Sequence, residues 1–335
     1  MKKLMSLMLI CAMATSMLLA GCTSNNSNTD ANTQKKKIGI IQLVEHDALD
    51  AANAGFIQAL ADAGYVDDEN IEIIQKNAQG ELSNCATIAT QLVNEKCDLI
   101  LAIATPAAQA VANATTDIPI LITAVTDPLD AGLIKDYDTP GTNVSGTSDL
   151  TPVDAQFQLL KDLLPDAANV GLLYNSGESN SVVQINLAKK AAEAQGLTYI
   201  DATVSESSEL RTVVESLNGK VDVIYAPTDN MIANGMATVA MVANELGLPV
   251  IVGEPGMCEN GGLATYGINY FDLGIQTGKM AAEVLGGADI STMSIQYLAV
   301  EGASLLINED TAAILDITIP DSLKDEAELI QTKSE

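Results

Sequence analysis

The sequence contains no tryptophan, a single histidine and a single arginine among its 335 residues. Lysine and arginine together number 16 against 44 aspartates and glutamates, so the formal net charge at pH 7 is −28. Nucleic-acid binding and electrostatic docking on an anionic membrane both need basic clusters, so this charge argues against both. With His46 as the lone histidine, multi-histidine metal sites are excluded, and we predict no metal and no cofactor.

The first 22 residues have the pattern of an export signal. Two lysines precede an apolar stretch at residues 4–20, and the segment ends in Leu-Ala-Gly-Cys22. This ending resembles the lipobox of bacterial lipoproteins, so we expect lipidation of Cys22 and anchoring on the outer side of the bacterial cell membrane. An ordinary signal peptide that contains a cysteine is the alternative. Residues 23–37 are polar and aperiodic, which predicts a disordered tether before a fold that begins near Ile38.

Three cysteines follow the tether, and no metal-binding spacing joins them. Cys85 and Cys97 flank one helical pattern, which places them about 18 Å apart at ~1.5 Å per residue, too far for a disulfide. Cys258 lies alone in the other half. We therefore predict three buried free thiols.

The body of the chain alternates apolar, β-branched runs with amphipathic helical patterns. With about two domains expected from the length and 47% apolar residues, this predicts an α/β fold of two doubly wound parallel-sheet lobes. The strands are expected at residues 38–44, 71–75, 99–104, 118–123, 170–174, 199–202, 221–226 and 250–252. Helices are expected between them, including residues 181–195, 209–217 and 232–246.

Extended stretches at residues 144–147, 263–270 and 295–299 are expected to cross between the lobes as a three-strand hinge. The predicted first lobe comprises residues 38–148 and 271–290, and the second comprises residues 149–270 and 291–330. Such an architecture closes around a ligand by rotation at the crossings.

Ligands of open parallel sheets bind beyond the carboxyl ends of the strands. The loops there are rich in hydroxyls, amides and carboxylates and contain no lysine or arginine. They supply the predicted ligand-binding residues: Glu45, His46, Thr105, Pro106, Thr126, Asp127, Ser176, Glu178, Asn180, Asp229, Asn230 and Glu254. Several also suit helix N-caps, and taken singly each fits that simpler role.

The missing side chains narrow the ligand. The single arginine, Arg211, lies on a predicted amphipathic helix far from the strand ends, so no arginine fork is available for a phosphate or dicarboxylate. No tryptophan is available to stack a sugar. A zwitterion fits better, with its ammonium on Asp229 or Glu178. Its carboxylate is expected at Thr105 and the free N–H groups of the helix start at Pro106.

Enzyme motifs are missing from the sequence: it has no GxGxxG after the first strand, no P-loop and no GxSxG. A nucleophilic Cys258 paired with His46 is conceivable, but the two fall in different predicted lobes. Metal binding by Glu45, His46 and Asp47 is also conceivable, although adjacent side chains point apart. We predict a non-enzymatic binding protein.

Several segments resemble the tryptophan/tyrosine-binding family of ABC-type solute-binding lipoproteins. They are Ile40-Ile41-Gln42-Leu43-Val44-Glu45-His46, Ile103-Ala104-Thr105-Pro106-Ala107-Ala108-Gln109, Thr126-Asp127-Pro128, Asn143-Val144-Ser145-Gly146-Thr147-Ser148-Asp149, Pro227-Thr228-Asp229-Asn230 and Asp272-Leu273-Gly274. The resemblance covers about residues 38–320. It implies a type I periplasmic-binding fold, an aromatic amino acid ligand and ABC permease subunits as partners. We also predict a monomer. Proline is common in that family where this chain has Asp47.

The sequence alone leaves alternatives to this interpretation open. The ligand of the same fold could instead be a branched-chain amino acid or a nucleoside. A sensor subunit or a lipid-anchored enzyme are the alternatives from other classes.

Overall fold

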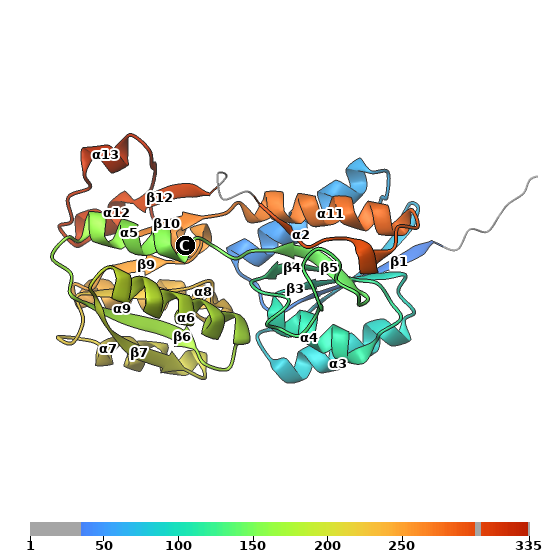
Figure 1. Cartoon of the computed structure of the whole chain (residues 1–335), viewed down its shortest axis with the longest axis horizontal. Coiled ribbons are helices and arrows are strands. Elements are labelled where there is room, and N and C mark those ends of the chain that lie inside the picture. The colour runs from blue at the N-terminus through green and yellow to red at the C-terminus, as the bar shows by residue number, and fades with distance from the viewer. Residues whose placement is uncertain (1–34, 299–302, 334–335) are drawn as a thin grey trace, which may run out of the picture. The chain divides into compact units, whose positions relative to one another are not determined.

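The computed structural model describes residues 35–298 and 303–333 (Figure 1). The chain divides into two compact units, Met1–Lys35 and Lys36–Glu335, and the fold described below lies in the second. The export signal, Cys22 and residues 23–34 of the predicted tether fall outside the described residues. Lys36 and Lys37, also assigned to the tether, belong to the first strand instead.

The first lobe is built on a six-stranded parallel sheet in the order β11-β5-β4-β3-β1-β2. Its strands are β1 (Lys36–Gln42), β2 (Ile71–Asn77), β3 (Leu99–Ile103), β4 (Ile120–Val125), β5 (Val144–Ser148) and β11 (Gln296–Tyr297). Helices α2 (Asp47–Asp62) and α11 (Tyr270–Leu285) cover one face, and α3 (Leu82–Asn94) and α4 (Thr105–Ala114) cover the other (Figure 1). Every residue of β3 and β4 is buried, as a sheet covered on both faces requires.

Helices α2 and α11 approach each other closely because glycines face the contact. A Cβ atom at Gly55 would lie 2.1 Å from the carbonyl oxygen of Phe271, and one at Gly274 would lie 2.0 Å from that of Ala52. No larger residue fits at either position. The close packing fixes the middle of α2 against the start of α11.

The second lobe is built on a seven-stranded sheet in the order β13-β12-β10-β9-β8-β6-β7. Its strands are β6 (Asn169–Asn175), β7 (Thr198–Val204), β8 (Val223–Ala226), β9 (Val250–Val252), β10 (Ala264–Gly267), β12 (Ser304–Asn308) and β13 (Glu328–Ile330). Its main helices are α5 (Val153–Leu163), α6 (Ser179–Ala194), α7 (Leu210–Ser216), α8 (Asn230–Asn234), α9 (Met236–Glu245) and α10 (Pro255–Glu259). The α/β prediction of two parallel-dominated sheets is confirmed.

Two details of the second lobe differ from the prediction. Strand β12 pairs antiparallel with β10, and the segment after it adds α12 (Glu309–Ile314), α13 (Asp321–Lys324) and β13, none of which was predicted. The helix predicted at residues 232–246 is broken at Gly235 into α8 and α9. A Cβ atom at Gly235 would lie 2.3 Å from a Leu210 methyl carbon, so the break brings α7 into close contact.

Three connections join the lobes. The first follows β5, the second joins β10 to α11, and the third lies between β11 and β12 and includes residues outside the described ranges. Strand β11 pairs with β5 of the first sheet, and Ile295 packs in the first core. The boundary predicted at residue 291 is therefore too early, and the third connection begins after Tyr297. Within the described ranges, no helix has both the length and the apolar character needed to cross a bilayer.

Candidate ligand-binding site

Residues from both lobes and from the connections enclose one cleft at the carboxyl ends of the strands. The first lobe and the connections contribute His46, Leu49, Ala124, Thr126, Asp149 and Tyr270. The second lobe contributes Asn180, Thr228, Asp229, Asn230, Ala233 and Glu254. The space between these walls is only about 10 Å³. A ligand of amino acid size therefore requires the walls to separate.

The first-lobe wall has unusual backbone geometry. Ala104 (φ 81°) and Ala124 (φ 53°) lie in the left-handed region at the ends of β3 and β4, although neither is glycine. The pairing of β4 with β5 also shifts register between Ile122 and Val125. Bulges and strained residues of this kind collect at functional sites, where they redirect side chains. Here they bring Ala124 and Thr126 to the cleft wall.

In the second-lobe wall, the carboxylates are held by protein donors. Asp229 is the N-cap of α8 and accepts from the backbone N–H of Ile232 (3.0 Å). Its other oxygen accepts from the backbone N–H of Asn175 (2.6 Å) and the hydroxyl of Ser181 (2.7 Å). Glu254 caps α10 in the same way, accepting from the N–H groups of Gly256 (2.6 Å) and Met257 (2.7 Å).

A hydrogen-bonded chain fixes the tautomer of His46. The amide nitrogen of Asn230 donates to Glu178, so the amide oxygen of Asn230 is turned toward His46 Nε2 at 3.4 Å. Nε2 must then carry the proton and donate it. Burial lowers the pKa of His46, with the Asn230 bond opposing, which favours the neutral ring. Nδ1 is therefore an acceptor.

Three buried atoms in the cleft residues have no hydrogen-bond partner: His46 Nδ1, Asp149 Oδ1 and Asn180 Oδ1. All three are acceptors, because the amide nitrogen of Asn180 already donates to Glu178 Oε2 (3.3 Å). A buried acceptor without a donor carries a free-energy penalty of about 1–3 kcal/mol. The wall is therefore suited to a ligand that brings several N–H or O–H donors.

The charge of the cleft also favours a ligand with N–H donors, and specifically a cationic one. Burial raises the pKa of Asp149 to about 6 and that of Glu254 to about 7, with hydrogen bonds partly opposing each shift. The pKa of Glu178 and that of Asp229 are also raised, by burial first and, for Glu178, by the neighbouring Asp229 charge. No lysine or arginine is among the described residues that line the cleft. Buried carboxylates without a counter-ion favour a cationic group.

Two hydroxyls line the cleft, and one of them, that of Thr228, can donate to an anion. The side-chain nitrogen of Gln184 donates to the hydroxyl oxygen of Thr228 at 2.6 Å and to that of Thr126 at 3.4 Å. The Thr228 hydroxyl is thereby used as an acceptor and keeps its own proton available for donation, whereas the Thr126 hydroxyl also interacts with the Asp149 carboxyl. Gln184 also joins the lobes, since Thr126 follows β4 and Thr228 follows β8.

The structure places the twelve predicted site residues in two groups. His46, Thr126, Asn180, Asp229, Asn230 and Glu254 line the cleft. Glu178 is buried directly behind them, where it accepts from Asn175, Asn180 and Asn230.

The remaining five lie elsewhere. Glu45 is exposed and lines a separate first-lobe groove, and Ser176 is exposed in a turn. Asp127 holds a turn by accepting from Leu129 N–H (3.0 Å), Asp130 N–H and the Tyr137 hydroxyl. Thr105 and Pro106 are buried at the start of α4 but do not line this cleft, and Ala104, not Thr105, is the N-cap.

Six cleft residues were missed by the sequence analysis: Leu49, Ala124, Asp149, Thr228, Ala233 and Tyr270. Asp149 lies on the first connection, Tyr270 begins α11 at the end of the second, and the hydroxyl of Tyr270 donates to Asp149 Oδ2 at 2.8 Å. A signal for both was present, because chain segments that cross between lobes must pass the cleft. Leu49 and Tyr270 were not recognised because apolar periodicity assigns them to the core.

The cysteines do not form a reactive site. Cys85, Cys97 and Cys258 are free and buried. Burial raises the pKa of the Cys258 thiol far above its usual range, and its sulfur lies 3.6 Å from the Gly262 carbonyl oxygen. Cys258 does not line the cleft that contains His46. Among the described residues, no cluster of metal-ligating side chains is found.

A family model described as "ABC transporter substrate binding protein" matches residues 37–330. The chain belongs to the ABC transporter substrate-binding protein family. It is 44% identical to a curated protein named tyrosine-binding protein from Clostridioides difficile, over 94% of this chain and 93% of that one. The family and this relative are both described as binding proteins.

Two solved structures are also similar to this substrate-binding protein. One is an ABC domain from Streptococcus pneumonia in complex with L-Trp, with a TM-score of 0.85, 40% identity, and coverage of 88% of this chain and 99% of that one. The other is a ligand-free, open substrate-binding protein with adhesive properties from Clostridium difficile. Its TM-score is 0.68 at 45% identity, with coverage of 89% and 100%.

Proposed function

We propose that this substrate-binding protein captures tyrosine or tryptophan outside the cytoplasmic membrane and presents it to the permease subunits of an ABC importer. The observation that carries the proposal is the set of three unpaired acceptors on His46, Asp149 and Asn180 in a cleft without lysine or arginine. An α-ammonium group supplies three N–H donors and a positive charge. The names of the relatives, one tyrosine-binding and one bound to L-Trp, support an aromatic amino acid.

Asp149 is the best-suited partner for the ammonium. Asp229, the residue expected from sequence, already accepts from two backbone N–H groups and from Ser181. Asp149 accepts from the Tyr270 hydroxyl and has the Thr126 hydroxyl beside it, and its Oδ1 has no partner within hydrogen-bond distance. An ammonium therefore gains more at Asp149, where it neutralises a buried charge and satisfies a bare acceptor.

The ligand carboxylate is assigned to the hydroxyl of Thr228. This hydroxyl keeps a free proton, because Gln184 donates to its oxygen, whereas the Thr126 hydroxyl interacts with Asp149. This replaces the role expected for Thr105 and Pro106, which begin α4 outside the cleft wall. A neutral hydroxyl holds a monoanion without adding a permanent charge to the cleft.

Binding requires the lobes to open and close. The structure aligns better with the L-Trp complex (TM-score 0.85) than with the ligand-free, open relative (0.68), although the open relative is the more identical in sequence. The difference therefore reflects lobe arrangement more than sequence divergence. The narrow cleft supports the same conclusion, since entry of an amino acid needs rotation about the connections.

We further propose that the protein is anchored through a lipid on Cys22 and works as a monomer. The support is the Leu-Ala-Gly-Cys22 ending and the polar segment after it. Cys22→Ser is expected to release the protein from the membrane fraction. An unmodified amino terminus on the mature protein, found by mass spectrometry, would contradict the anchor.

The ligand is testable without labels. The protein has no tryptophan, so bound L-tryptophan is the sole indole in the complex, and its emission is expected to shift on binding. L-tyrosine is then expected to compete, and ligand at ~1,000 times Kd adds about 4 kcal/mol of stability in a thermal unfolding assay. L-leucine and adenosine serve as comparators. If neither aromatic amino acid binds below millimolar concentration, the aromatic assignment fails.

A further inference from the structure

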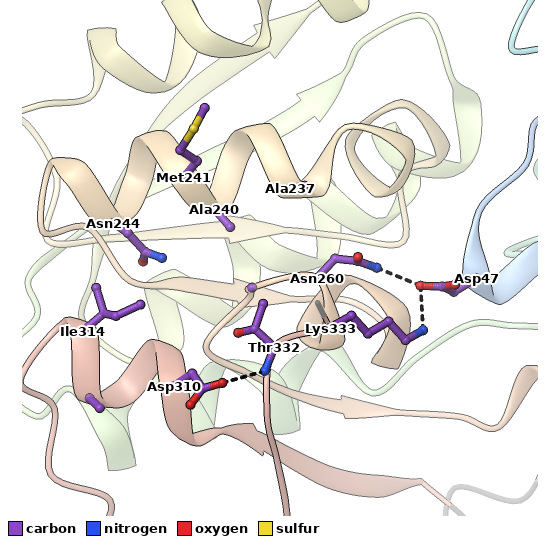
Figure 2. Close-up of a pocket in the computed structure, with 12 residues that line it drawn as sticks. Asp47, Ala237, Ala240, Met241, Asn244, Asn260, Asp310, Ile314, Thr332 and Lys333 are labelled. Atoms are coloured by element: carbon purple, nitrogen blue, oxygen red, sulfur yellow. Dashed lines mark hydrogen bonds and ion pairs between the residues drawn. The ribbon is translucent and has the colours of Figure 1, made fainter. Parts of the chain in front are cut away.

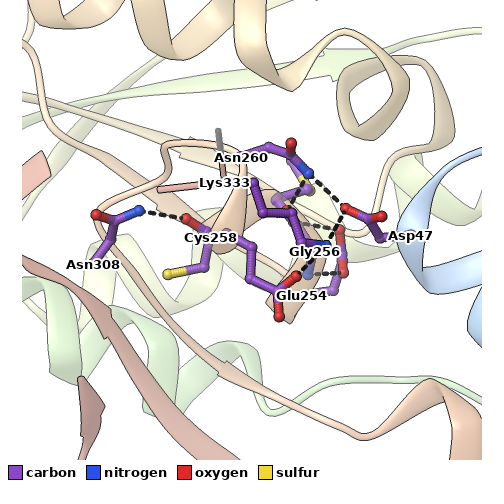
Figure 3. Close-up of polar contacts among 9 residues, drawn as sticks. Asp47, Glu254, Gly256, Cys258, Asn260, Asn308 and Lys333 are labelled. Atoms are coloured by element: carbon purple, nitrogen blue, oxygen red, sulfur yellow. Dashed lines mark hydrogen bonds and ion pairs between the residues drawn. The ribbon is translucent and has the colours of Figure 1, made fainter. Parts of the chain in front are cut away.

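A cluster of polar contacts joins the two lobes outside the cleft. Asp47, the first residue of α2 in the first lobe, accepts from the side-chain nitrogen of Asn260 at 2.7 Å. The same oxygen, Oδ2, lies 3.0 Å from Lys333 Nζ. Figures 2 and 3 show Asp47 reaching across from its own helix toward Asn260 and Lys333. These contacts exist only while the lobes are together.

The second-lobe side of this contact is assembled without Asp47. Lys333 Nζ lies 2.6 Å from a Glu259 carboxylate oxygen, and the Lys333 N–H donates to the Glu259 carbonyl at 2.9 Å. The preceding Thr332 donates its N–H to Asp310 (3.0 Å) and accepts from Asn308 (3.0 Å). Lys333 is thus held in place by its own lobe and is ready to receive Asp47.

Both sides of the contact are directly connected to cleft residues. Asp47 follows His46, which lines the cleft. On the other side, Glu254 lines the cleft and caps the short helix α10, and Asn260 at the end of α10 donates to the Gly256 carbonyl at 2.8 Å. Closure that brings His46 and Glu254 to the ligand therefore also brings Asp47 to Asn260 and Lys333.

The lobes also approach closely beside this contact. A Cβ atom at Gly256 would lie 2.9 Å from Asp47 Cβ, closer than side-chain carbons come to one another. The glycine lets the start of α2 approach the start of α10. Asp47 is the one first-lobe residue in a surface groove of about 790 Å³ whose other described lining residues belong to the second lobe (Figure 2).

We propose that Asp47, Asn260 and Lys333 form a closure latch, a set of positioning residues that do not touch the ligand but determine how long it is held. The inference rests on the proposed function, because it concerns the retention of the same ligand. Since the latch forms after the ligand has entered, it stabilises the closed complex and leaves the encounter step unchanged. Loss of the latch is therefore expected to raise the dissociation rate and to leave the association rate unchanged.

Lys333→Met is the cleanest test, because Lys333 lies outside the cleft. Stopped-flow measurement with L-tryptophan is expected to show dissociation about 2- to 5-fold faster, with the association rate within 2-fold of the unmodified protein. Asp47→Ala, which also removes the Asn260 bond, is expected to raise dissociation about 10-fold. The dissociation rate of the double variant is expected to equal that of Asp47→Ala within about 2-fold, because both substitutions remove the same Asp47–Lys333 contact.

The matched control is Lys189→Met. It removes an ion pair with Asp201 (2.8 Å) that lies wholly within the second lobe, so both rates are expected to remain unchanged. High salt screens half-exposed pairs such as Lys333–Asp47, so the difference between Lys333→Met and the unmodified protein is expected to shrink at 1 M NaCl.

Equal dissociation rates in the unmodified protein, Lys333→Met and Asp47→Ala would overturn the latch while leaving the proposed function intact. If the unmodified protein binds neither aromatic amino acid, the proposed function fails and the latch is judged by inter-lobe distance. Spin labels on Thr87→Cys and Lys190→Cys, exposed on different lobes, report that distance. A smaller closed population in Lys333→Met supports the latch, and identical distance distributions refute it.

Discussion

The carboxylates inside the cleft and the carboxylate at its rim differ in how their charge is balanced. Inside, Asp149 and Glu254 are fully buried without a cation, and burial raises the pKa of each. At the rim, partial burial also acts to raise the pKa of Asp47, but Lys333 and Asn260 outweigh it and hold that pKa below its usual value. The rim carboxylate therefore has a cation beside it in the protein itself, whereas the cleft carboxylates gain one only from a cationic ligand.

This difference assigns ligand recognition to the cleft and ligand retention to the rim. Groups whose charge is unbalanced gain most when a ligand arrives, so the cleft carboxylates determine what is bound. The rim pair is half-exposed and already satisfied, and exposed ion pairs contribute only about 0.2–1 kcal/mol. The rim can therefore adjust the lifetime of the complex without changing its specificity. Substitutions in the cleft should therefore change which ligand is bound, whereas substitutions at the rim should change only the lifetime of the complex.

The largest effect is expected from Asp149→Asn. It removes the negative charge and the bare acceptor assigned to the ammonium, so the Kd for L-tryptophan is expected to rise about 30- to 150-fold, or ~2–3 kcal/mol. The measurement is the indole fluorescence titration at pH 8. A change below about 3-fold would remove Asp149 from the ammonium site.

Asp229→Asn is the matched comparison, because it neutralises a second buried carboxylate in the same cleft. One oxygen of Asp229 accepts from both Asn175 and Ser181, and an amide nitrogen there would face the Asn175 N–H. We expect a loss of about 1–3 kcal/mol in stability with Kd changed less than 5-fold. A larger affinity loss than for Asp149→Asn would restore the ammonium role to Asp229.

A pH titration is expected to give the next largest effect. The pKa of Asp149 is raised to about 6 and that of Glu254 to about 7, so lowering the pH from 8 to 5.5 neutralises the groups that attract the ammonium. Affinity for L-tryptophan is expected to fall about 10-fold over this range. Loss of affinity only below pH 5 would contradict raised pKa values in the cleft.

The stability of the ligand-free protein should change in the opposite direction. A carboxyl whose folded-state pKa lies above its unfolded-state value binds its proton more tightly when folded, so it destabilises the ionised native state. For Asp149 and Glu254 this penalty is absent below about pH 4 and grows up to their folded-state pKa values, about 6 and 7. Their contribution therefore makes the ligand-free protein less stable as the pH rises through this window, while affinity increases.

Much of the fold could be predicted from sequence, because apolar runs such as Leu99–Ile103 occur where both faces of a parallel sheet are buried. The carboxyl-terminal part of the second sheet could not, since β12 reverses direction against β10 and the helices and strand that follow it are short. In the site, strand-end residues such as Asn180 and Asp229 were identified by topology. Tyr270 was missed because its ring is core-like, and only its hydroxyl contact with Asp149 gives it a role in the cleft.

The smallest effect is expected from Tyr270→Phe, which tests how the cleft tunes Asp149 without removing it. The Tyr270 hydroxyl donates to Asp149 Oδ2 at 2.8 Å and lowers the pKa of that carboxyl against the larger effect of burial. Without it, the pKa of Asp149 rises further, so the midpoint of the affinity profile should move to higher pH. At pH 8, Kd is expected to rise only about 2- to 3-fold. Tyr137→Phe is the control, since it removes an equivalent hydroxyl bond, to Asp127 (2.7 Å), outside the cleft. An unshifted midpoint in Tyr270→Phe would mean that Asp149 does not govern the pH dependence, and Glu254 would then be the group that does.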